Sequence, residues 1–215
     1  MTDTLALYIA VPVAGFRAPH AREYFETLPL PPPSTLYGML LSLVGETDRS
    51  AHEGTELAFA VLGEPELSVV LRTTWRIKSK KQNPGLGSNR RPDFQELLTG
   101  LRLAAWVRAG DTEHADPCLR ERIAAVLANP PTSNRFGALS LGESTHLVDE
   151  IRALQPADLQ QARFLVADPD GDLSLPSWPN HVGSRGTVWG QYRLHPALDA
   201  EEPPPQAWIP ISRHA

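Results

Sequence analysis

Residues 28–45, LPLPPPSTLYGMLLSLVG, lead a rigid run of prolines directly into an apolar segment. Ser34 follows the last proline, and serine is favoured at the N-cap of a helix. Behind it, apolar residues recur at the three- and four-residue spacing of one helix face, and Gly45 stands where glycine often ends a helix. The sequence therefore predicts a helix that begins at Ser34 and ends near Gly45. Because Gly38 costs about 1 kcal/mol relative to alanine inside a helix, we expect a close approach to the backbone there.

Three segments outside this helix have the residue patterns of strands. Residues 5–13 are apolar on both faces, as in a central strand. Residues 69–78 and 101–108 each alternate between an apolar and a basic face, and Trp75 falls on the apolar face, which predicts a place in the core. The segment between these two strands is basic and contains glycine and proline. The pattern predicts a long β-hairpin whose tip projects from the body.

The remaining elements place the chain in the α+β class. Asp116 and Pro117 suit the N-cap and first position of a second helix, which Asn129 and two prolines end. A glycine turn and a short strand are expected within residues 138–151. The order strand, helix, strand, strand, helix, strand predicts a split βαβ, ferredoxin-like core.

A late hairpin and a proline-rich tail follow this core. Residues 163–167 and 173–175 flank Asp-Pro-Asp-Gly, a favourable turn sequence. We therefore expect one domain over residues 1–152, with the projecting hairpin inserted at about residues 72–108. Residues 153–215 are expected to form a β-rich C-terminal extension packed on the same domain.

Positive charge is concentrated in the predicted hairpin. The whole chain has a formal charge of -5, yet residues 72–92 contain no Asp or Glu and hold every lysine of the protein. Such a local field favours contact with a polyanion, and a solvated basic loop is the alternative. The basic residues of this segment are Arg72, Arg76, Lys78, Lys80, Lys81, Arg90 and Arg91.

Composition argues against secreted and membrane classes. Cys118 is the single cysteine, so an internal disulfide framework is excluded and a reducing cytoplasm is expected. The N-terminal segment has an early Asp3 and no basic region of the kind that opens a signal peptide. No apolar run approaches the roughly 20 residues needed to span a bilayer. We expect a cytoplasmic protein without membrane contact.

The common catalytic and metal-binding motifs are missing from the sequence. It contains no P-loop, HExxH, paired CxxC or GxSxG, and its histidines lack metal-ligand spacing, so we expect no metal site and no cofactor. Metal-independent RNA cleavage needs only a base, an acid and a cation near the scissile phosphate. His20, Tyr24 and one lysine of the basic segment can supply these, so an endoribonuclease remains an alternative.

Two motifs in a fixed order carry a family resemblance. LPLPPPSTLYGMLLSLVGE (residues 28–46) follows the first strand, and RFGALSLGESTHLVDEI (residues 135–151) follows the second helix. In this order they resemble the fifth family of CRISPR-associated proteins (Cas five), which belongs to the RAMP superfamily. The resemblance covers residues 5–152, and the type I branch fits best.

The resemblance implies a non-catalytic, RNA-binding subunit of the type I surveillance complex, Cascade. Family members hold the 5′ handle of the CRISPR RNA (crRNA) and contact the terminal filament subunit. They also contact the large subunit that reads the PAM, and so support crRNA-guided recognition of target DNA. Their fold is an RRM-like RAMP core with a projecting β-hairpin thumb, which the basic hairpin predicted above matches.

The resemblance also implies where the RNA is held. Phosphates are expected at the N-terminus of the first helix, beside the Ser34 and Thr35 hydroxyls. Handle bases are expected to stack on aromatic side chains such as Tyr24. A purely structural role for the prolines, as a cover for the sheet edge, is the alternative. Besides the basic hairpin residues, the predicted RNA-binding residues are Arg17, His20, Arg22, Tyr24, Ser34, Thr35, Arg135 and Gly137.

One branch of the family departs from this binding-only role. Some members cleave the precursor RNA themselves with a Tyr–His–Lys kind of site. This sequence has Tyr24, but residues 78–82 of the predicted thumb read KSKKQ and contain no Lys–His pair. The departure favours RNA binding without catalysis, with an endoribonuclease as the second hypothesis and a generic RRM-like RNA-binding protein as the third.

Overall fold

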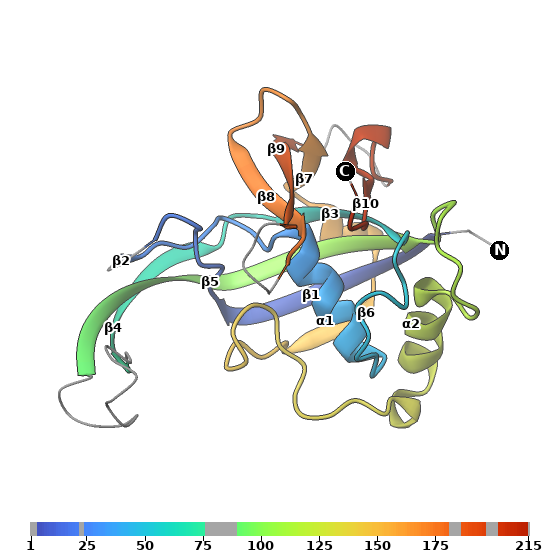
Figure 1. Ribbon diagram of the computed structural model, residues 1–215, viewed down its shortest axis with the longest axis horizontal. Coiled ribbons are helices and arrows are strands. Elements are labelled where there is room, and N and C mark those ends of the chain that lie inside the picture. Colours follow the sequence, from blue (N-terminus) through green and yellow to red (C-terminus); the bar gives the residue numbers. More distant parts are fainter. Residues whose placement is uncertain (1–3, 22–23, 76–89, 181–185, 197–201, 215) are drawn as a thin grey trace.

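The computed structural model describes residues 4–21, 24–75, 90–180, 186–196 and 202–214. These residues form a mixed structure in which one large, mostly antiparallel sheet is accompanied by two α-helices (Figure 1). The predicted α+β class is therefore confirmed. In the described part of the chain, neither helix is long and apolar enough to cross a membrane.

The sheet is built around its three middle strands. The described strands are β1 (Thr4–Ala14), β2 (Tyr24–Phe25), β3 (Glu56–Leu62), β4 (Glu66–Trp75), β5 (Arg90–Arg108), β6 (Glu150–Ala153), β7 (Ala162–Ala167), β8 (Leu173–Trp178), β9 (Val188–Pro196) and β10 (Ile209–Pro210). The α-helices are α1 (Pro33–Leu43) and α2 (Leu119–Ala128), and short 3-10 helices lie at Pro130–Thr132, Pro156–Leu159 and Pro205–Ala207. The strand order is β6-β1-β5-β3-β7-β9-β8, with β10 paired to β3, and β2 and β4 paired to β5.

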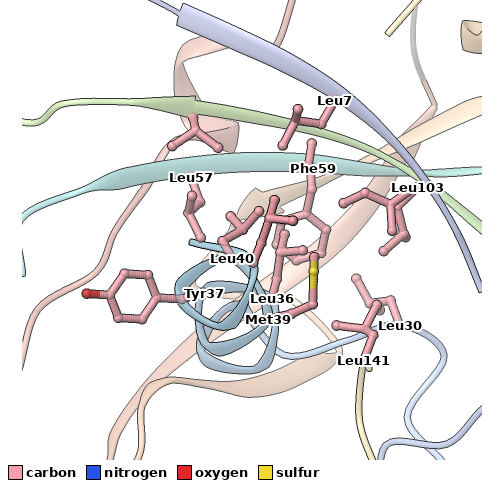
Figure 2. Close-up of a cluster of buried hydrophobic side chains, with 14 of the residues drawn as sticks. Leu7, Leu30, Leu36, Tyr37, Met39, Leu40, Leu57, Phe59, Leu103 and Leu141 are labelled. Carbon is pink, nitrogen blue, oxygen red and sulfur yellow. The ribbon is translucent and has the colours of Figure 1, made fainter. Parts of the chain in front are cut away.

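Helix α1 packs on one face of the central strands. Leu36, Met39 and Leu40 point toward Phe59 of β3 and Leu103 of β5, and all five side chains are buried (Figure 2). Burying one such side chain contributes about 1.5–3 kcal/mol, so this contact fixes the helix on the sheet. A smaller buried cluster covers the opposite face, because alternate residues of a strand point to opposite sides. It comprises Ala58, Ala60, Leu62, Ala104, Trp106, Ala162, Phe164 and Ala207.

Helix α1 differs from the prediction at its start. It begins at Pro33 with Pro32 as the N-cap, so Ser34 is the second helical residue and its side chain makes no capping bond. Proline suits the first helical position because its φ is already helical and its missing N–H is not needed there. The predicted end is close to the observed one, since Gly45 follows the helix with a φ of +72°.

Strand β3 is missing from the sequence-based prediction. It lies between β5 and β7, and its apolar residues are buried on both faces. Such a strand lacks the alternation that marks a half-buried one, and this explains the omission.

The predicted hairpin has a different second arm. Strand β4 pairs with the first half of β5, from Glu66 opposite Thr99 to Trp75 opposite Arg90. Residues 101–108 form the second half of β5 and pair with β1 and β3 in the middle of the sheet. We call β4 and residues 90–99 of β5 the ribbon. In Figure 1 the ribbon curves away from the rest of the sheet.

Two predictions about which strand residues are buried are wrong. Trp75 is 51% exposed instead of lying in the core, because both faces of β4 meet solvent where the ribbon leaves the sheet. Conversely, Ala104 and Trp106, predicted on a basic face, are buried in the second cluster. The alternating pattern showed that each strand has two different faces. It did not show whether each face would be packed against other residues or left in solvent.

Two further boundaries differ from the prediction. Helix α2 begins at Leu119 with Cys118 as its N-cap, later than Asp116. Strands β7 and β8 do not pair directly, because β9 lies between them and pairs with both. The expected turn between them forms, with the N–H of Gly171 donating to the carbonyl of Asp168 at 2.9 Å.

Candidate functional site

Two adjoining cavities form one groove between α1 and the ribbon. The first, of about 560 Å³, lies beside the N-terminal half of α1, and the second, of about 350 Å³, lies beside the ribbon. Both are lined by Gly15, Phe16, Arg17 and Glu143, so they are continuous. The first is also lined by Pro32, Ser34, Thr35, Gly38, Met39, Ser42, Arg49, Ser140, Gly142, Pro176 and Pro179. The second is also lined by Phe25, Glu26, Thr27, Arg72, Thr73, Thr74, Trp75, Gln95 and Glu96.

The start of α1 supplies a polar wall for this groove. Ser34 is only 4% exposed, and among the described residues its hydroxyl has no hydrogen-bond partner. The unpartnered oxygen is not itself a buried atom, so the hydroxyl opens to the cavity that Ser34 lines and is free to bond a ligand there. The positive end of the helix dipole lies at the same place, so this wall favours an anion.

Arg49 brings a cation to the same wall, and sequence reasoning missed it. The Tyr37 hydroxyl donates to the Arg49 carbonyl at 2.8 Å, which holds the loop after α1 against the helix. The Arg49 Nη1 atom is buried and has no hydrogen-bond partner among the described residues. Burial lowers the pKa of this guanidinium from its ordinary value. Its Nη2 atom lies 3.6 Å from the position that a Cβ at Gly38 would take, so Gly38 leaves room for it.

The glycine-rich segment closes the middle of the groove. Gly142 has a φ of +95°, and a Cβ there would lie 2.8 Å from the Gly15 carbonyl oxygen. The buried His146 accepts hydrogen bonds at Nδ1 from the N–H groups of Gly15 and Glu143, at 3.2 and 3.3 Å. Burial lowers the pKa of His146, the Arg72 charge adds to this, and the Glu143 carboxylate opposes it. The neutral ring thus ties the end of β1 to the glycine segment.

The groove side of the ribbon is polar and internally paired. Arg72 donates to Glu143 at 2.9 Å and contacts Gln95, while Gln95 donates to Glu143 at 2.9 Å. Burial alone would raise the pKa of Glu143, but the hydrogen bonds from Arg72 and Gln95 hold that pKa below its usual range. The ribbon is therefore joined to the glycine segment through one carboxylate.

The structure brings several predicted RNA-binding residues to this groove. Arg17, Ser34, Thr35 and Arg72 line it directly. Arg17 also lies 4.4 Å over the Phe25 ring and donates to the Ala21 carbonyl at 2.9 Å.

Three more predicted residues lie on the ribbon or beside it. Tyr24 belongs to β2, which pairs with β5. Arg90 lies 5.0 Å over the Trp75 ring, and Arg91 Nε is 3.1 Å from Asp93 Oδ1.

Other predicted residues do not join the groove. His20 is exposed and its Nε2 atom lies 2.6 Å from Glu26 Oε2. Arg135 donates to the Gly137 carbonyl, and its backbone lies beside Gly45, at the far end of α1 from Ser34. Arg22, Arg76, Lys78, Lys80 and Lys81 lie outside the described residues.

The groove presents guanidinium and hydroxyl groups that suit an anion. No three His, Cys, Asp or Glu side chains within them gather in an arrangement that could hold a metal ion. Tyr24, the predicted acid or base, has a pKa raised by burial and by the nearby Glu96 and Glu26 carboxylates.

Comparison with known proteins gives a close relative and several similar folds, two of which are described below. No protein-family model matches the sequence. The chain is 42% identical over 215 residues to the CRISPR-associated protein Cas5 of Myxococcus xanthus (strain DK1622), covering 98% of this chain and 99% of the relative.

Both similar folds come from solved structures of CRISPR-related proteins. A chain of a CRISPR RNA-guided surveillance complex matches with a TM-score of 0.60, covering 95% of each chain. A Cas protein crystal structure matches with a TM-score of 0.52, covering 94% of this chain and 100% of that one. Each is 14% identical to this sequence, so these two likenesses concern the fold alone.

Proposed function

This chain belongs to the Cas5 family of CRISPR-associated proteins, and from this membership we propose that it is the crRNA-handle-binding subunit of a type I Cascade complex. In this role it binds and caps the 5′ handle of the crRNA in the cytoplasm. It contacts the adjacent filament subunit and the large subunit, and it supports crRNA-guided recognition of target DNA. The 42% identity to a Cas5 protein confirms the family resemblance that the two sequence motifs carried.

The observation that carries the proposal is the anion-favouring wall at the start of α1. Ser34 has an unpartnered hydroxyl that opens to the cavity, and Arg17 and Arg49 line the same cavity. A phosphate placed there would accept from the hydroxyl and lie between two guanidinium groups at the positive end of a helix dipole. RNA handles are bound as single strands through such phosphate contacts together with base stacking.

The ribbon supports the same function as the proposed thumb of a RAMP-type, ferredoxin-like core. It extends from the sheet beside the groove, and Arg72 and Arg91 lie on the same side of β4 and β5. The residues that follow Trp75 carry the lysines of the chain. A strand lying in the groove would therefore pass beside Arg72 of the ribbon.

A binding role without catalysis fits the surroundings of the candidate acid and base. The raised pKa of Tyr24 makes its phenol a weaker acid and leaves less phenolate to act as a base, and His20 is engaged with Glu26. Endoribonuclease activity is the alternative function, because the candidate lysines lie outside the described residues.

One experiment tests binding and cleavage together. Purified protein is incubated in EDTA with labelled CRISPR repeat RNA, and bound and cleaved RNA are measured. We expect binding without cleavage. Ser34→Ala should weaken binding about tenfold, because a hydrogen bond to a charged group contributes about 1.5–3 kcal/mol. Ser174→Ala, on β8 outside the groove, is the matched control. Cleavage that His20→Ala or Tyr24→Phe abolishes would establish the endoribonuclease instead, and equal binding by both serine variants would remove the groove from the proposal.

A further inference from the structure

A set of hydrogen-bonded polar side chains lies outside the groove, close in sequence and space to the loop that carries Arg49. His52 Nδ1 is 2.8 Å from Glu113 Oε1, and His52 Nε2 is 2.8 Å from Arg122 Nη1. The side chains of His52 and Glu113 are 2% and 0% exposed. We call His52, Glu113 and Arg122 the His52 network. None of its members lines either cavity of the groove.

The two contacts of the imidazole define its tautomer. An arginine side chain has donors and no acceptor, so Arg122 donates to Nε2 of His52. Nδ1 then carries the ring proton and donates it to the Glu113 carboxylate. Because both nitrogens are used, the neutral ring is held in one orientation from two sides.

The His52 network joins the loop after α1 to helix α2. The Glu113 carboxylate also accepts from the N–H of Leu119, the first residue of α2, at 2.7 Å. Arg122, further along the same helix, donates to the Val44 carbonyl at 3.2 Å and to Glu46 at 2.6 Å. Helix α2 therefore holds the loop near its start, at residues 44 and 46, and near its end, at residue 52.

Arg49 lies within the loop that is held in this way. The Tyr37 hydroxyl donates to the Arg49 carbonyl at 2.8 Å, and the His52 backbone interacts with the same hydroxyl. The place of His52 thus affects the place of Arg49 through one phenol. The guanidinium depends on such support, because its Nη1 atom is buried without a hydrogen-bond partner among the described residues. A loop free to move would let this unpaired cation turn out into water.

Stability alone does not explain a polar network at this position. Replacing a buried ion pair by apolar residues of similar size is often neutral or stabilising. The Glu113 Oε2 atom adds a further cost, because it is buried and has no hydrogen-bond partner in the described part of the chain. What hydrogen bonds supply and apolar contacts do not is one fixed arrangement of the groups that they join.

We propose that His52 is the positioning residue for Arg49. The His52 network holds the loop so that the Arg49 guanidinium stays in the groove, unpaired and available to an RNA phosphate. His52 itself touches no RNA. The proposal rests on the proposed function, since it takes an RNA phosphate as the ligand of Arg49.

The test separates positioning from stability with one apolar variant, His52→Leu/Glu113→Met. This variant should unfold at about the same urea concentration as wild type. Its affinity for labelled repeat RNA should nevertheless fall about tenfold, because the hydrogen bond of Arg49 to a charged phosphate is lost. The slope of log K against log salt should become shallower by about 0.7, the value for one phosphate on a single strand.

Asp158→Asn is the matched control for this variant. Asp158 Oδ2 is paired with Arg152 Nη1 at 2.7 Å, so the substitution also weakens a carboxylate contact, but it does so outside the groove. The RNA affinity and the salt slope of Asp158→Asn should stay at the wild-type values. A loss of RNA affinity in this control equal to that of the apolar variant would overturn the proposal.

Combination with Arg49→Met decides whether His52 acts through Arg49. Adding Arg49→Met to the apolar variant should change the RNA affinity by less than about twofold, because the contact is already lost. Losses that multiply would overturn the proposal, and so would an apolar variant that binds RNA as wild type does. If the apolar variant does not fold, Arg122→Met, which leaves His52 bonded to Glu113, must show the same dependence on Arg49.

A measurement without RNA distinguishes this proposal from the RNA-binding function. The Arg49 Nε–H signal in a proton–nitrogen NMR spectrum should move in the apolar variant and stay in place in Asp158→Asn. If wild type bound no RNA while this signal moved as expected, the RNA-binding function would fail and the positioning of Arg49 by His52 would stand. A signal that did not move would overturn the positioning role whatever the RNA result.

Discussion

The N–H of Gly15 donates a hydrogen bond to the Nδ1 atom of His146 across 3.2 Å, and so joins the end of β1 to the glycine-rich segment. The same Nδ1 atom accepts from the N–H of Glu143. An imidazole nitrogen can accept only when it carries no proton, so both contacts require the neutral ring. The shape of the groove at its middle therefore depends on the protonation state of one buried histidine.

Stability should fall in mild acid because of this histidine. Its pKa lies below the ordinary 6.5, so the unfolded chain binds the proton more readily than the folded one. The stabilising contribution is thus fully present above about pH 6.5 and is lost as the pH falls from there through the lower folded pKa. We expect urea unfolding to show lower stability at about pH 5.5 than at about pH 7.5.

Two substitutions at this position separate titration from hydrogen bonding. His146→Asn keeps an acceptor near Nδ1 but cannot be protonated, and it should reduce the difference between the two pH values. His146→Leu leaves two buried N–H groups without an acceptor and should cost about 1–3 kcal/mol at neutral pH. A pH dependence that His146→Asn left unchanged would assign the effect to another group.

Glu46 should contribute to acid stability in a lower pH range. Arg122 Nη1 lies 2.6 Å from Glu46 Oε2, and this hydrogen bond lowers the pKa of Glu46 to about 2. A carboxyl whose pKa is lowered by folding stabilises the folded protein at pH values above the pKa of the unfolded chain, which is 4.5 for Glu46. That contribution is lost as the pH falls through about 2.

The measurement is the difference in unfolding free energy between wild type and Glu46→Gln. Because the Glu46 side chain is 21% exposed, solvent screening limits the expected loss to about 1–2 kcal/mol at pH 7. The difference should shrink as the pH is lowered below about 4.5, and a difference independent of pH would contradict the ion-pair explanation.

Gly142 should tolerate alanine less well than Gly137 does. Both glycines have positive φ, +95° and +77°, so alanine strains the backbone at either position. Only at Gly142 would the new Cβ also collide, at 2.8 Å from the Gly15 carbonyl oxygen, whereas nothing lies within 4 Å at Gly137. We expect Gly142→Ala to cost about 1 kcal/mol more in urea unfolding than Gly137→Ala. Equal losses of unfolding free energy in the two variants would mean that backbone strain alone explains both.

The sequence predicted some elements of the fold and missed others, and the difference lies in which faces of each element are buried. Helix α1 was found from local signals, a proline-rich start, apolar residues at helical spacing and a closing glycine, which survive without knowledge of the neighbours. Strand β3, buried on both faces, carries no such pattern. The alternation in β4 was visible, but it assigned Trp75 to the core, because a sequence does not say whether an apolar face will be packed or left open.

The candidate site was only partly predictable for a similar reason. Ser34 and Thr35 could be placed at the helix start from local rules, and they line the groove. Arg135 was grouped with them, but α1 is about 16 Å long and Arg135 lies at its other end. Arg49 could not have been selected, since its position depends on a loop that folds back onto α1 through the Tyr37 hydroxyl.

Arg49 should therefore contribute to RNA binding in a way that salt can reveal. If its guanidinium neutralises one phosphate, Arg49→Met should lower the affinity for single-stranded repeat RNA. The slope of log K against log salt should also become shallower by about 0.7, the value for one phosphate on a single strand. Arg213→Met is the matched control, because Arg213 is paired with Glu53 at 2.7 Å and lies outside the groove. A lower affinity with an unchanged slope would mean that Arg49 shapes the cavity without contacting phosphate, whereas equal slopes and affinities for the two variants would exclude Arg49 from the RNA path.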